Sequence, residues 1–351
     1  MRLHFLVAWA MSILPSSLVL AENVDYWQSK RQMETAYEQK DNSYRRLLAS
    51  SFQLDIQQFS TQAEKASESQ DFSEVIYLPD LTGEMIPFLI RKQSNFSSVL
   101  AAKFPKINAY SGVGLKNNAL KLRLSISPNG ISAIISGDKA SGKMRINRVA
   151  MGRNRYSVSN SPEVSDTRNP FSCMTPEPTR QATKPKIDLI NLQQSSAAFS
   201  DASILSKYRL ALSVTSQYSD YFGGTLEGSL AAINETLTEL NFIFETDLGV
   251  KLELVDNNDL IVYVDAEADP YTDNLDGLNS ELQANLDEVI GAENYDIGHV
   301  FSSINASMSG NAGAIGAVCN DSNKGSAWSD WAQPQGSIWT NLVAHEMGHQ
   351  L

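Results

Sequence analysis

The chain has 351 residues, of which 42% are hydrophobic and 19% charged; this excludes an intrinsically disordered protein and leaves room for two domains. Its net charge of −12 is divided unevenly: residues 22–200 carry 23 Lys and Arg against 17 Asp and Glu, a net of +6, whereas residues 201–351 carry 4 against 23, a net of −19. The acidic second half argues against a nucleic-acid partner there, and the opposite signs favour docking of the first unit on the second.

Residues 1–21 have the pattern of a secretory signal peptide. Arg2 supplies a positive start, residues 3–14 are apolar, and residues 19–21 suit signal-peptidase cleavage. An uncleaved membrane anchor is the alternative, but Pro15 and the two serines after it break the apolar run. No other stretch is apolar enough to span a bilayer. We therefore expect an exported protein, secreted or periplasmic, with no membrane span once the leader is removed.

Residues 22–156 are predicted to form a small unit that is first helical and then β-rich. Residues 22–70 are polar with scattered aromatic side chains, and they predict one or two surface helices. From Phe72 onward, short β-like runs are separated by turn residues. Residues 120–126 and 131–135 flank Ser127-Pro128-Asn129-Gly130, and an Asn-Gly pair between two such runs predicts a hairpin.

Residues 157–200 are predicted to be an exposed linker. Five prolines lie among Ser, Thr, Asn and Arg without a periodic apolar pattern. Such a segment is sensitive to proteases, and its basic cleavage candidates are Arg180, Lys184 and Lys186. The linker also holds Cys173, one of two cysteines; because export permits oxidation, Cys173 and Cys319 could form a disulfide or have separate roles.

Residues 201–351 alternate between strand and helix patterns, which predicts an α/β sandwich with a mixed sheet. The helix pattern is clearest in residues 225–245, where apolar residues recur at steps of three and four. Gly291 is placed to close a second helix. The expected strands are 208–215, 250–255, 260–264, 297–301 and 314–319, and the expected helices are 225–245, 278–290 and 338–351.

The last predicted helix carries His345-Glu346-Met347-Gly348-His349. Two histidines four residues apart project from one helix face and can hold one zinc ion. Glu346, beside them, can take a proton from water activated by the zinc and pass it to the leaving amine. An amphipathic helix with two surface histidines is the alternative, but the chain has only four histidines and two fall at this spacing. The motif therefore predicts a zinc-dependent peptidase.

Two histidines do not complete a catalytic zinc site, which normally takes three protein ligands and leaves one position for water. His299 is the only other histidine after the leader, and it lies in the strand-like run 295–301. A structural hydrogen-bonding role is expected there rather than ligation. The third ligand is therefore expected after Leu351.

The stretch from Tyr208 to Leu351 resembles the bacterial reprolysin-like (adamalysin-type) metzincins. The matching segments, in family order, are YRLALSVTSQYSDYFGG, AAINETLTELNFIFETDLGVKLELVDN, YDIGHVFS, AGAIGAVCN and HEMGHQL. The resemblance implies the N-terminal part of a metzincin catalytic domain over residues 201–351, namely its upper subdomain with a mixed twisted sheet and long helices. It also implies a second glycine, a third histidine and a methionine turn after Leu351.

The resemblance assigns three further roles. Gly313, Ala314, Ile315, Gly316 and Ala317 would form the edge strand that pairs with the substrate backbone, with a plain core strand as the alternative. Residues 78–137 resemble the propeptide of these enzymes, which makes residues 22–156 a propeptide. Cys173 becomes a candidate inhibitory switch that holds the fourth zinc position, with a disulfide or an unpaired thiol as alternatives. Cys319 corresponds to a cysteine that the family pairs with one after the zinc helix.

The sequence therefore predicts a secreted zinc-dependent endopeptidase, made as a zymogen and acting on protein or peptide substrates, with this chain by itself inactive. One alternative is a zincin whose third ligand is a downstream glutamate. Another is a secreted binding or adhesion protein with an inactive peptidase-like domain. Calcium is a further candidate cofactor because Asp265, Glu267, Asp269 and Asp273 cluster in one predicted loop, although a solvated acidic loop explains the same cluster.

Overall fold

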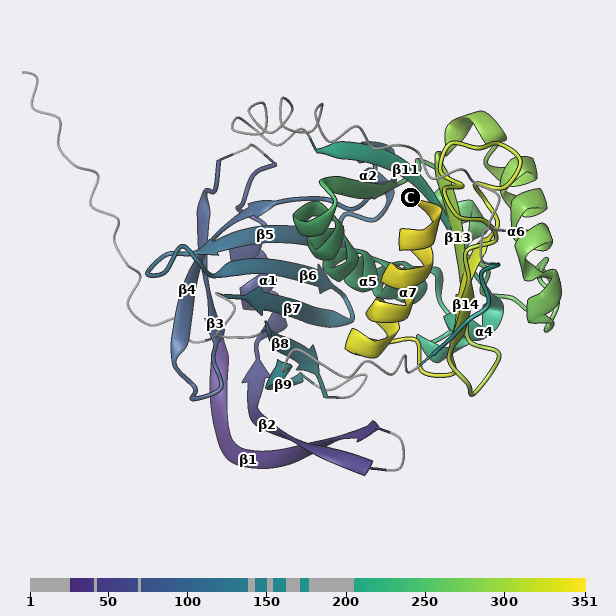
Figure 1. Cartoon of the computed structure of the whole chain (residues 1–351). Coiled ribbons are helices and arrows are strands. Elements are labelled where there is room, and N and C mark those ends of the chain that lie inside the picture. Colours follow the sequence, from purple (N-terminus) through teal and green to yellow (C-terminus); the bar gives the residue numbers. More distant parts are fainter. Residues whose placement is uncertain are drawn as a thin grey trace, which may run out of the picture.

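The computed structural model describes residues 26–40, 43–68, 71–137, 143–149, 154–161, 171–176 and 205–351. Within them the chain forms two β-sheets, with two helices running between the sheets and another on the far side of the second sheet (Figure 1). The predicted signal peptide and the cleavage candidates Arg180, Lys184 and Lys186 lie outside the described residues. Among the described residues, no helix combines the length and hydrophobicity needed to cross a membrane.

The first sheet, which we call sheet A, has nine antiparallel strands in the order β1-β2-β9-β8-β7-β6-β5-β4-β3. Two short helices, α1 and α2, accompany it, and β9 continues past the predicted linker boundary at residue 156. The elements are β1 (Trp27–Lys40), β2 (Ser43–Leu54), α1 (Ile56–Ala63), β3 (Glu74–Pro79), β4 (Met85–Lys92), α2 (Ser98–Lys103), β5 (Asn108–Gly114), β6 (Lys121–Ser127), β7 (Gly130–Ser136), β8 (Lys143–Arg148) and β9 (Arg155–Ser161).

The prediction of one or two helices in residues 22–70 is wrong except at α1. The segment forms the long hairpin β1–β2, and the hairpin joins sheet A through the pairing of β2 with β9. Trp27 packs edge-on against Phe52 at 6.2 Å and against Tyr156 of β9 at 5.8 Å between ring centroids. These contacts come from residues far apart in the chain, and they override a local pattern that had suggested helix.

The predicted hairpin at residues 127–130 is confirmed. Ser127 pairs with Gly130 at the end of the β6–β7 ladder. The turn needs glycine, because Gly130 has φ of +119°, outside the region that side chains favour. The backbone N–H of Asn129 also donates to the Ser127 hydroxyl at 3.2 Å, which closes the turn.

The second sheet, sheet B, has six strands in the order β10-β14-β15-β13-β11-β12. Every pairing is parallel except that of β14 with β15, so the predicted α/β fold with a mixed sheet is confirmed. Its elements are β10 (Ser172–Cys173), β11 (Ser206–Val214), α4 (Ser216–Tyr221), α5 (Leu226–Asp247), β12 (Val250–Leu254), η1 (Asn258–Ile261), α6 (Leu275–Val289), η2 (Ala292–Asn294), β13 (Ile297–Ser302), β14 (Ser309–Asn311), β15 (Ala327–Asp330) and α7 (Gly336–Gln350).

Two predicted strands of this half are wrong. Residues 260–264 begin in the 3-10 helix η1 and keep only an isolated bridge between Val262 and Val214. Residues 314–319 form turns, while the strand lies earlier, at β14. Gly313 and Gly316 have φ of +68° and +66°, so the backbone there cannot stay extended. The short apolar runs had the composition of strands without the backbone geometry.

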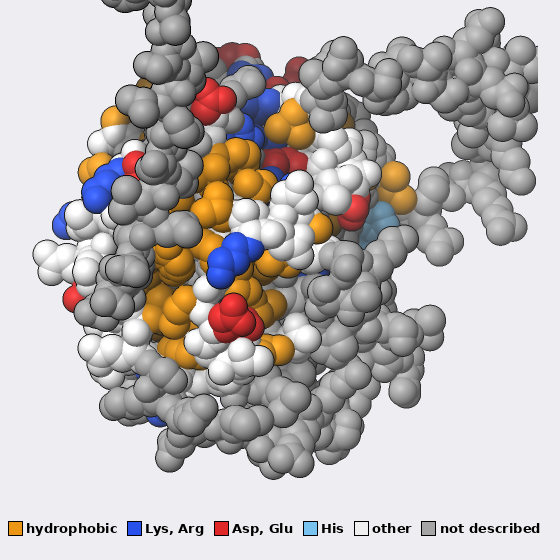
Figure 2. All heavy atoms as spheres, turned by 90° about the vertical axis from the view of Figure 1, so that its left-hand side faces the viewer, with side chains coloured by type: hydrophobic (Ala, Val, Ile, Leu, Met, Phe, Trp, Pro, Cys, Tyr) orange, Lys and Arg blue, Asp and Glu red, His pale blue; other side chains and the backbone are white. Residues whose placement is uncertain are grey.

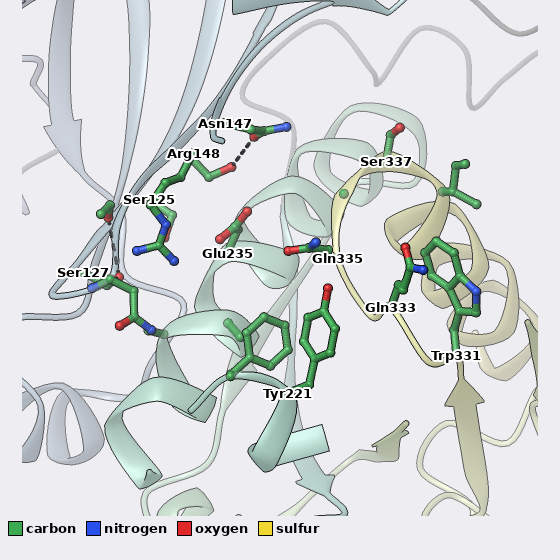
Figure 3. A pocket seen from close by; sticks show the side chains of 18 of the residues that line it. Ser125, Ser127, Asn147, Arg148, Tyr221, Glu235, Trp331, Gln333, Gln335 and Ser337 are labelled. Carbon is green, nitrogen blue, oxygen red and sulfur yellow. Dashed lines mark hydrogen bonds between the residues drawn. The ribbon is translucent and has the colours of Figure 1, made fainter. Parts of the chain in front are cut away.

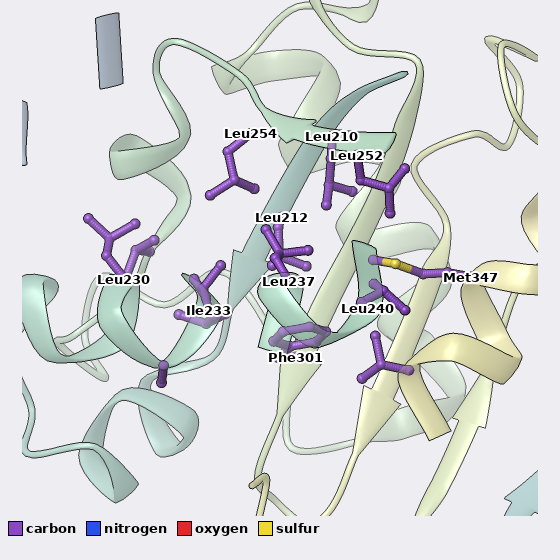
Figure 4. Packing of buried hydrophobic residues seen from close by; sticks show 14 of the residues in the cluster. Leu210, Leu212, Leu230, Ile233, Leu237, Leu240, Leu252, Leu254, Phe301 and Met347 are labelled. Carbon is purple, nitrogen blue, oxygen red and sulfur yellow. The ribbon is translucent and has the colours of Figure 1, made fainter. Parts of the chain in front are cut away.

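The hydrophobic core of the second half lies between sheet B and helices α5 and α7. Leu210 and Leu212 of β11 face Leu237 and Leu240 of α5, and Met347 of α7 enters the same cluster (Figure 4). All five side chains are fully buried, and burying one such side chain contributes about 1.5–3 kcal/mol. The apolar face of α7 thereby fixes that helix against α5 and leaves its other face for polar residues.

A buried polar network joins sheet A to α5. The Asn95 amide group donates to the Asn234 side chain at 3.0 Å and to the Thr238 hydroxyl at 2.8 Å, and the Asn241 amide donates back to Asn95 at 3.0 Å. Residues 95–97 also extend sheet B, because the Ser97 N–H donates to the Leu254 carbonyl at the outer edge of β12. The two units therefore share hydrogen bonds that neither could satisfy alone.

Ion pairs of the predicted sign support the same contact. Arg123 of β6 pairs with Glu245, and Arg145 of β8 pairs with Glu239, both acids lying on α5. All four side chains are at most 16% exposed. Cations of sheet A thus meet the acidic helix of the second half.

The side of sheet A that faces the viewer in Figure 2 has a different surface. Hydrophobic side chains cover much of its described area, with few charged ones among them.

Candidate active site

The two histidines of the motif lie together on α7. His345 and His349 are one helical turn apart, and their Nε2 atoms are 3.0 Å from each other. The preceding turns anchor the helix through the buried side chains of Trp339 and Leu342. Burial and the neighbouring His349 both lower the pKa of His345, which favours the neutral imidazole that a metal requires. The predicted pair of ligands is therefore assembled by the local geometry of one helix.

A third potential ligand comes from residues 171–176, which precede the second half of the chain. Strand β10, the edge strand of sheet B, pairs in parallel with β14 and brings the Cys173 Sγ to 3.5 Å from His349 Nε2. The ligand atoms of Cys173, His345 and His349 all lie within 4.8 Å of one another. A tetrahedral zinc site would separate two nitrogens by about 3.3 Å and a nitrogen from a sulfur by about 3.6 Å. The spacings of His345 to His349 and of His349 to Cys173 are therefore close to those of such a site.

Glu346 lies beside these ligands and is fully buried. Its Oε2 accepts a hydrogen bond of 2.9 Å from the hydroxyl of Thr175, which follows Cys173 by two residues. Burial raises the pKa of Glu346 to about 7, although the Thr175 hydrogen bond acts to lower it. A carboxyl group with a pKa near neutrality is suited to accept and return a proton.

A comparison with known families identifies this domain. The model of the family described as metallo-peptidase family M12B, reprolysin-like, matches residues 205–351. Residues 205–351 are a reprolysin-like metallopeptidase domain of family M12B. The resemblance drawn from the sequence is thereby confirmed, and with it the general class of zinc-dependent peptide hydrolases. A search of curated proteins found no match to the chain.

His299 takes no part in the candidate metal site of the reprolysin-like domain. Its ring is fully buried, with Nδ1 at 3.3 Å from the Gln350 Oε1 and Nε2 at 3.0 Å from the Ser329 hydroxyl. The expected hydrogen-bonding role is confirmed. Gln350 also donates to the carbonyl of Gly298 at 3.0 Å. This network holds the residue after His349 against β13 and so fixes the end of α7.

The stability of the domain should fall in acid because of His299. Burial lowers the pKa of His299 from 6.5 to about 4, so below pH 6.5 the unfolded chain binds a proton that the folded one does not. The resulting loss of unfolding free energy reaches about 3 kcal/mol towards pH 4. Urea unfolding across this range should show a flatter pH dependence for His299→Gln. Parallel plots of unfolding free energy against pH for the wild type and His299→Gln would contradict this. The pKa of His345 is lowered in both proteins, so its contribution cancels when the two plots are subtracted.

Gly310 is a functional position that the sequence did not reveal. Strand β14 approaches α7 so closely that a Cβ atom on Gly310 would lie 2.4 Å from Glu346 Cγ and 2.7 Å from its Cδ. The Gly310 carbonyl also accepts a hydrogen bond from Met174 N–H at 2.8 Å. Glycine is therefore needed there for close approach, not for an unusual backbone angle. The only signal in the sequence was one glycine in a glycine-rich stretch.

Gly310→Ala should displace Glu346 or push β14 away from it. We expect kcat for peptide hydrolysis by the cleaved full-length protein to fall at least about tenfold and the unfolding free energy by about 1–3 kcal/mol. Gly348→Ala on α7 is the matched control, because a Cβ there meets nothing within 4 Å and should be neutral or stabilising. Steady-state kinetics and thermal unfolding of both variants test this. If Gly310→Ala behaved like Gly348→Ala, the close approach of β14 to Glu346 would have no functional or structural importance.

The predicted substrate strand Gly313–Ala317 is a loop against the end of α7. The Gly316 N–H donates to the His349 carbonyl at 2.8 Å, and Val318 N–H donates to the Gln350 carbonyl at 2.9 Å. The antiparallel strand of the sheet is instead β14, which lies immediately before this loop and pairs with β10 on its outer side. The loop is thus held by the carbonyls of His349 and Gln350, and the role of its five residues in substrate binding stays a prediction.

The disulfide considered between Cys173 and Cys319 does not form, because both cysteines are exposed and unpaired. In the acidic loop, Asp269 accepts from the Ser216 N–H at 2.6 Å and Asp273 accepts from the Gln217 amide at 2.9 Å. These carboxylates accept hydrogen bonds from the first turn of α4. Among the described residues, the only group arranged to hold a metal is Cys173, His345 and His349, which leaves the calcium prediction unsupported.

A separate polar cavity of ≈ 1250 Å³ lies between sheet A and the second half of the chain. Figure 3 shows Arg148 of β8 beside Glu235 of α5 on one side, with Tyr221 and Gln335 facing them from α4 and from the segment before α7. None of the candidate metal ligands lines this cavity. It is therefore distinct from the active-site cluster on α7.

Proposed function

We propose that the chain is the N-terminal part of an exported zinc endopeptidase made as a zymogen. The observation that carries the proposal is the pair of histidines His345 and His349 on α7, with Glu346 between them directly beside strand β14. In this proposal His345 and His349 hold the metal together with a third ligand located after Leu351. Zinc, when bound there, would polarise the scissile carbonyl and lower the pKa of a water molecule.

Glu346 is assigned the proton transfer. Its carboxylate, buried next to both histidines, accepts the proton of the attacking water and returns it to the leaving amine. A pKa of about 7 suits both steps, because the group must exist in both protonation states during each turnover. The substrate, a protein or extended peptide, would add by backbone hydrogen bonds to the edge of β14 that β10 occupies in this structure, flanked by the loop Gly313–Ala317.

The position of the segment 171–176 on β14 supports the zymogen part of the proposal. This segment pairs with β14 through hydrogen bonds from Ser172 N–H to the Met308 carbonyl, 3.0 Å, and from Met174 N–H to the Gly310 carbonyl, 2.8 Å. A peptide substrate could not occupy the same edge at the same time. The thiol of Cys173, beside His349, would hold the fourth metal position and exclude water.

Sheet A is proposed to be a propeptide docked on the acidic domain. The ion pairs of Arg123 and Arg145 with α5 and the network around Asn95 support this arrangement. Activation would then require cleavage within residues 177–204, where the basic candidates lie, so that segment 171–176 can leave β14. The leader at residues 1–21 would export the zymogen across the cytoplasmic membrane, to the periplasm or to the outside of the cell.

Metal content and chelation test the proposed function. The full-length protein, extended past Leu351, should bind one zinc per chain and hydrolyse casein or gelatin after cleavage of the linker. Treatment with 1,10-phenanthroline should abolish hydrolysis, and added zinc should restore it. Zinc binding without hydrolysis would favour the alternative of a secreted binding protein with an inactive domain. Hydrolysis that resists the chelator would contradict the zinc mechanism.

A further inference from the structure

The segment 171–176 contacts the active-site helix through every second residue. The ring of Phe171 lies edge-on to His345, with 5.0 Å between centroids. The Cys173 Sγ lies 3.5 Å from His349, and the Thr175 hydroxyl lies 2.9 Å from Glu346. Side chains two apart on an extended chain share one face. Each of the three functional residues of α7 therefore has its own partner on one face of this segment.

The hydroxyl of Thr175 makes two hydrogen bonds whose directions are fixed. It accepts from Ala312 N–H at 2.8 Å, because a backbone N–H can only donate. Its single proton is then free for Glu346 Oε2, which must act as the acceptor. Thr175 thus joins the general base to the backbone that immediately follows β14. Glu346 is fully buried, so this hydroxyl takes the place of solvent on that oxygen.

We propose that Thr175 is a second inhibitory contact, which holds the general base Glu346 while Cys173 holds the metal side of the site. The proposal deepens the proposed zymogen function and rests on it. A general base must lie within about 2.6–3.2 Å of the oxygen that it deprotonates, and the Thr175 oxygen lies in this range. The hydroxyl therefore occupies the position that the attacking water needs next to Glu346.

The two contacts differ in their dependence on the metal and should be separable. The Cys173 thiol lies beside His349 and also hydrogen-bonds Glu346, and it would become a ligand when the metal is bound, so its inhibitory effect is strongest with the metal present. The Thr175 hydrogen bonds involve Glu346 and Ala312 only, so they persist when the metal is removed. The difference allows Thr175 to be tested by a measurement that does not depend on enzyme activity.

Hydrogen exchange of the intact, metal-free full-length protein measures how often segment 171–176 leaves β14. The protected amide to follow is that of Met174, which bonds to Gly310. A hydrogen bond to a charged group contributes enough that Thr175→Val should speed this exchange about tenfold. Thr175→Ser keeps the hydroxyl and should stay near the wild-type rate. The β6–β7 hairpin is the internal control for an unchanged fold; equal rates in the Val and Ser variants would overturn the proposal.

A double-mutant cycle separates a contact with Glu346 from general loosening. In the background of Glu346→Leu, the effect of Thr175→Val on the exchange of Met174 should shrink, leaving the share contributed by Ala312. An undiminished effect would mean that the hydroxyl does not act through Glu346, and the proposal would be wrong.

Measuring peptide hydrolysis by the uncleaved, zinc-loaded full-length protein distinguishes failure of this proposal from failure of the zymogen proposal on which it rests. Cys173→Ala and Thr175→Val should each raise hydrolysis of a fluorogenic peptide, and the double variant should exceed both. A rise with Cys173→Ala alone would refute the role of Thr175 and leave the zymogen intact. If neither variant nor cleavage of the linker raises activity, the zymogen proposal fails, even where the exchange data show that Thr175 holds the segment.

Discussion

Glu346→Gln should lower peptide hydrolysis by the cleaved full-length protein by about 10³-fold, the scale of general acid–base catalysis. Glutamine has nearly the same shape and can still accept a hydrogen bond, but it cannot take up the proton of water. Glu346 is fully buried, with a pKa raised to about 7, and the metal-site cluster of Cys173, His345 and His349 contains no carboxylate. Its loss should therefore have no substitute nearby.

Measuring the zinc content of Glu346→Gln distinguishes loss of the general base from damage to the metal site. The side chains of His345 and His349 are unchanged in this variant, so one zinc per chain should still be found by mass spectrometry of the dialysed protein. Glu267→Gln, in the exposed loop after η1, is the matched control and should keep wild-type kcat and KM. Full activity of Glu346→Gln would show that the proposed mechanism is wrong. Inactivity with loss of zinc would show that the variant damages the site itself.

The sequence predicted the elements whose pattern is long and local. Helix α5 has apolar residues at steps of three and four over six turns, and its Thr225 side chain accepts from Gly228 N–H at 3.1 Å as an N-cap. The motif on α7 likewise needs only the geometry of one helix to bring its two histidines together. Such features are set by neighbours in the chain, which is why they were read correctly.

The errors lie where distant residues decide the structure. The β1–β2 hairpin is fixed by the pairing of β2 with β9, more than a hundred residues later, and no local pattern encodes that partner. The turn at Gly313 and Gly316 was mistaken for a strand because composition does not show a positive φ. Gly310 and Thr175 were missed for a related reason, since their roles exist only once β14 and β10 lie beside α7.

Cys173→Ala should activate the uncleaved full-length protein. In the structure the Cys173 thiol lies beside His349, and contacts of Phe171 and Thr175 also hold the segment against α7. Removing the thiol weakens the inhibited state relative to the open one. A loss of only about 1.4 kcal/mol raises the open fraction tenfold, so peptide hydrolysis should rise by at least about tenfold without any cleavage.

The second cysteine supplies the control for this prediction. Cys319 is also exposed and unpaired, but it lies among the turns that follow the loop Gly313–Ala317, outside the metal-site cluster. Cys319→Ala should therefore leave the uncleaved protein inactive. Because the proposed mechanism needs zinc to activate the attacking water, the activated variant should remain fully sensitive to chelators. An uncleaved Cys173→Ala protein as inactive as the wild type, yet activated normally by linker cleavage, would mean that strand pairing with β14 inhibits without the thiol.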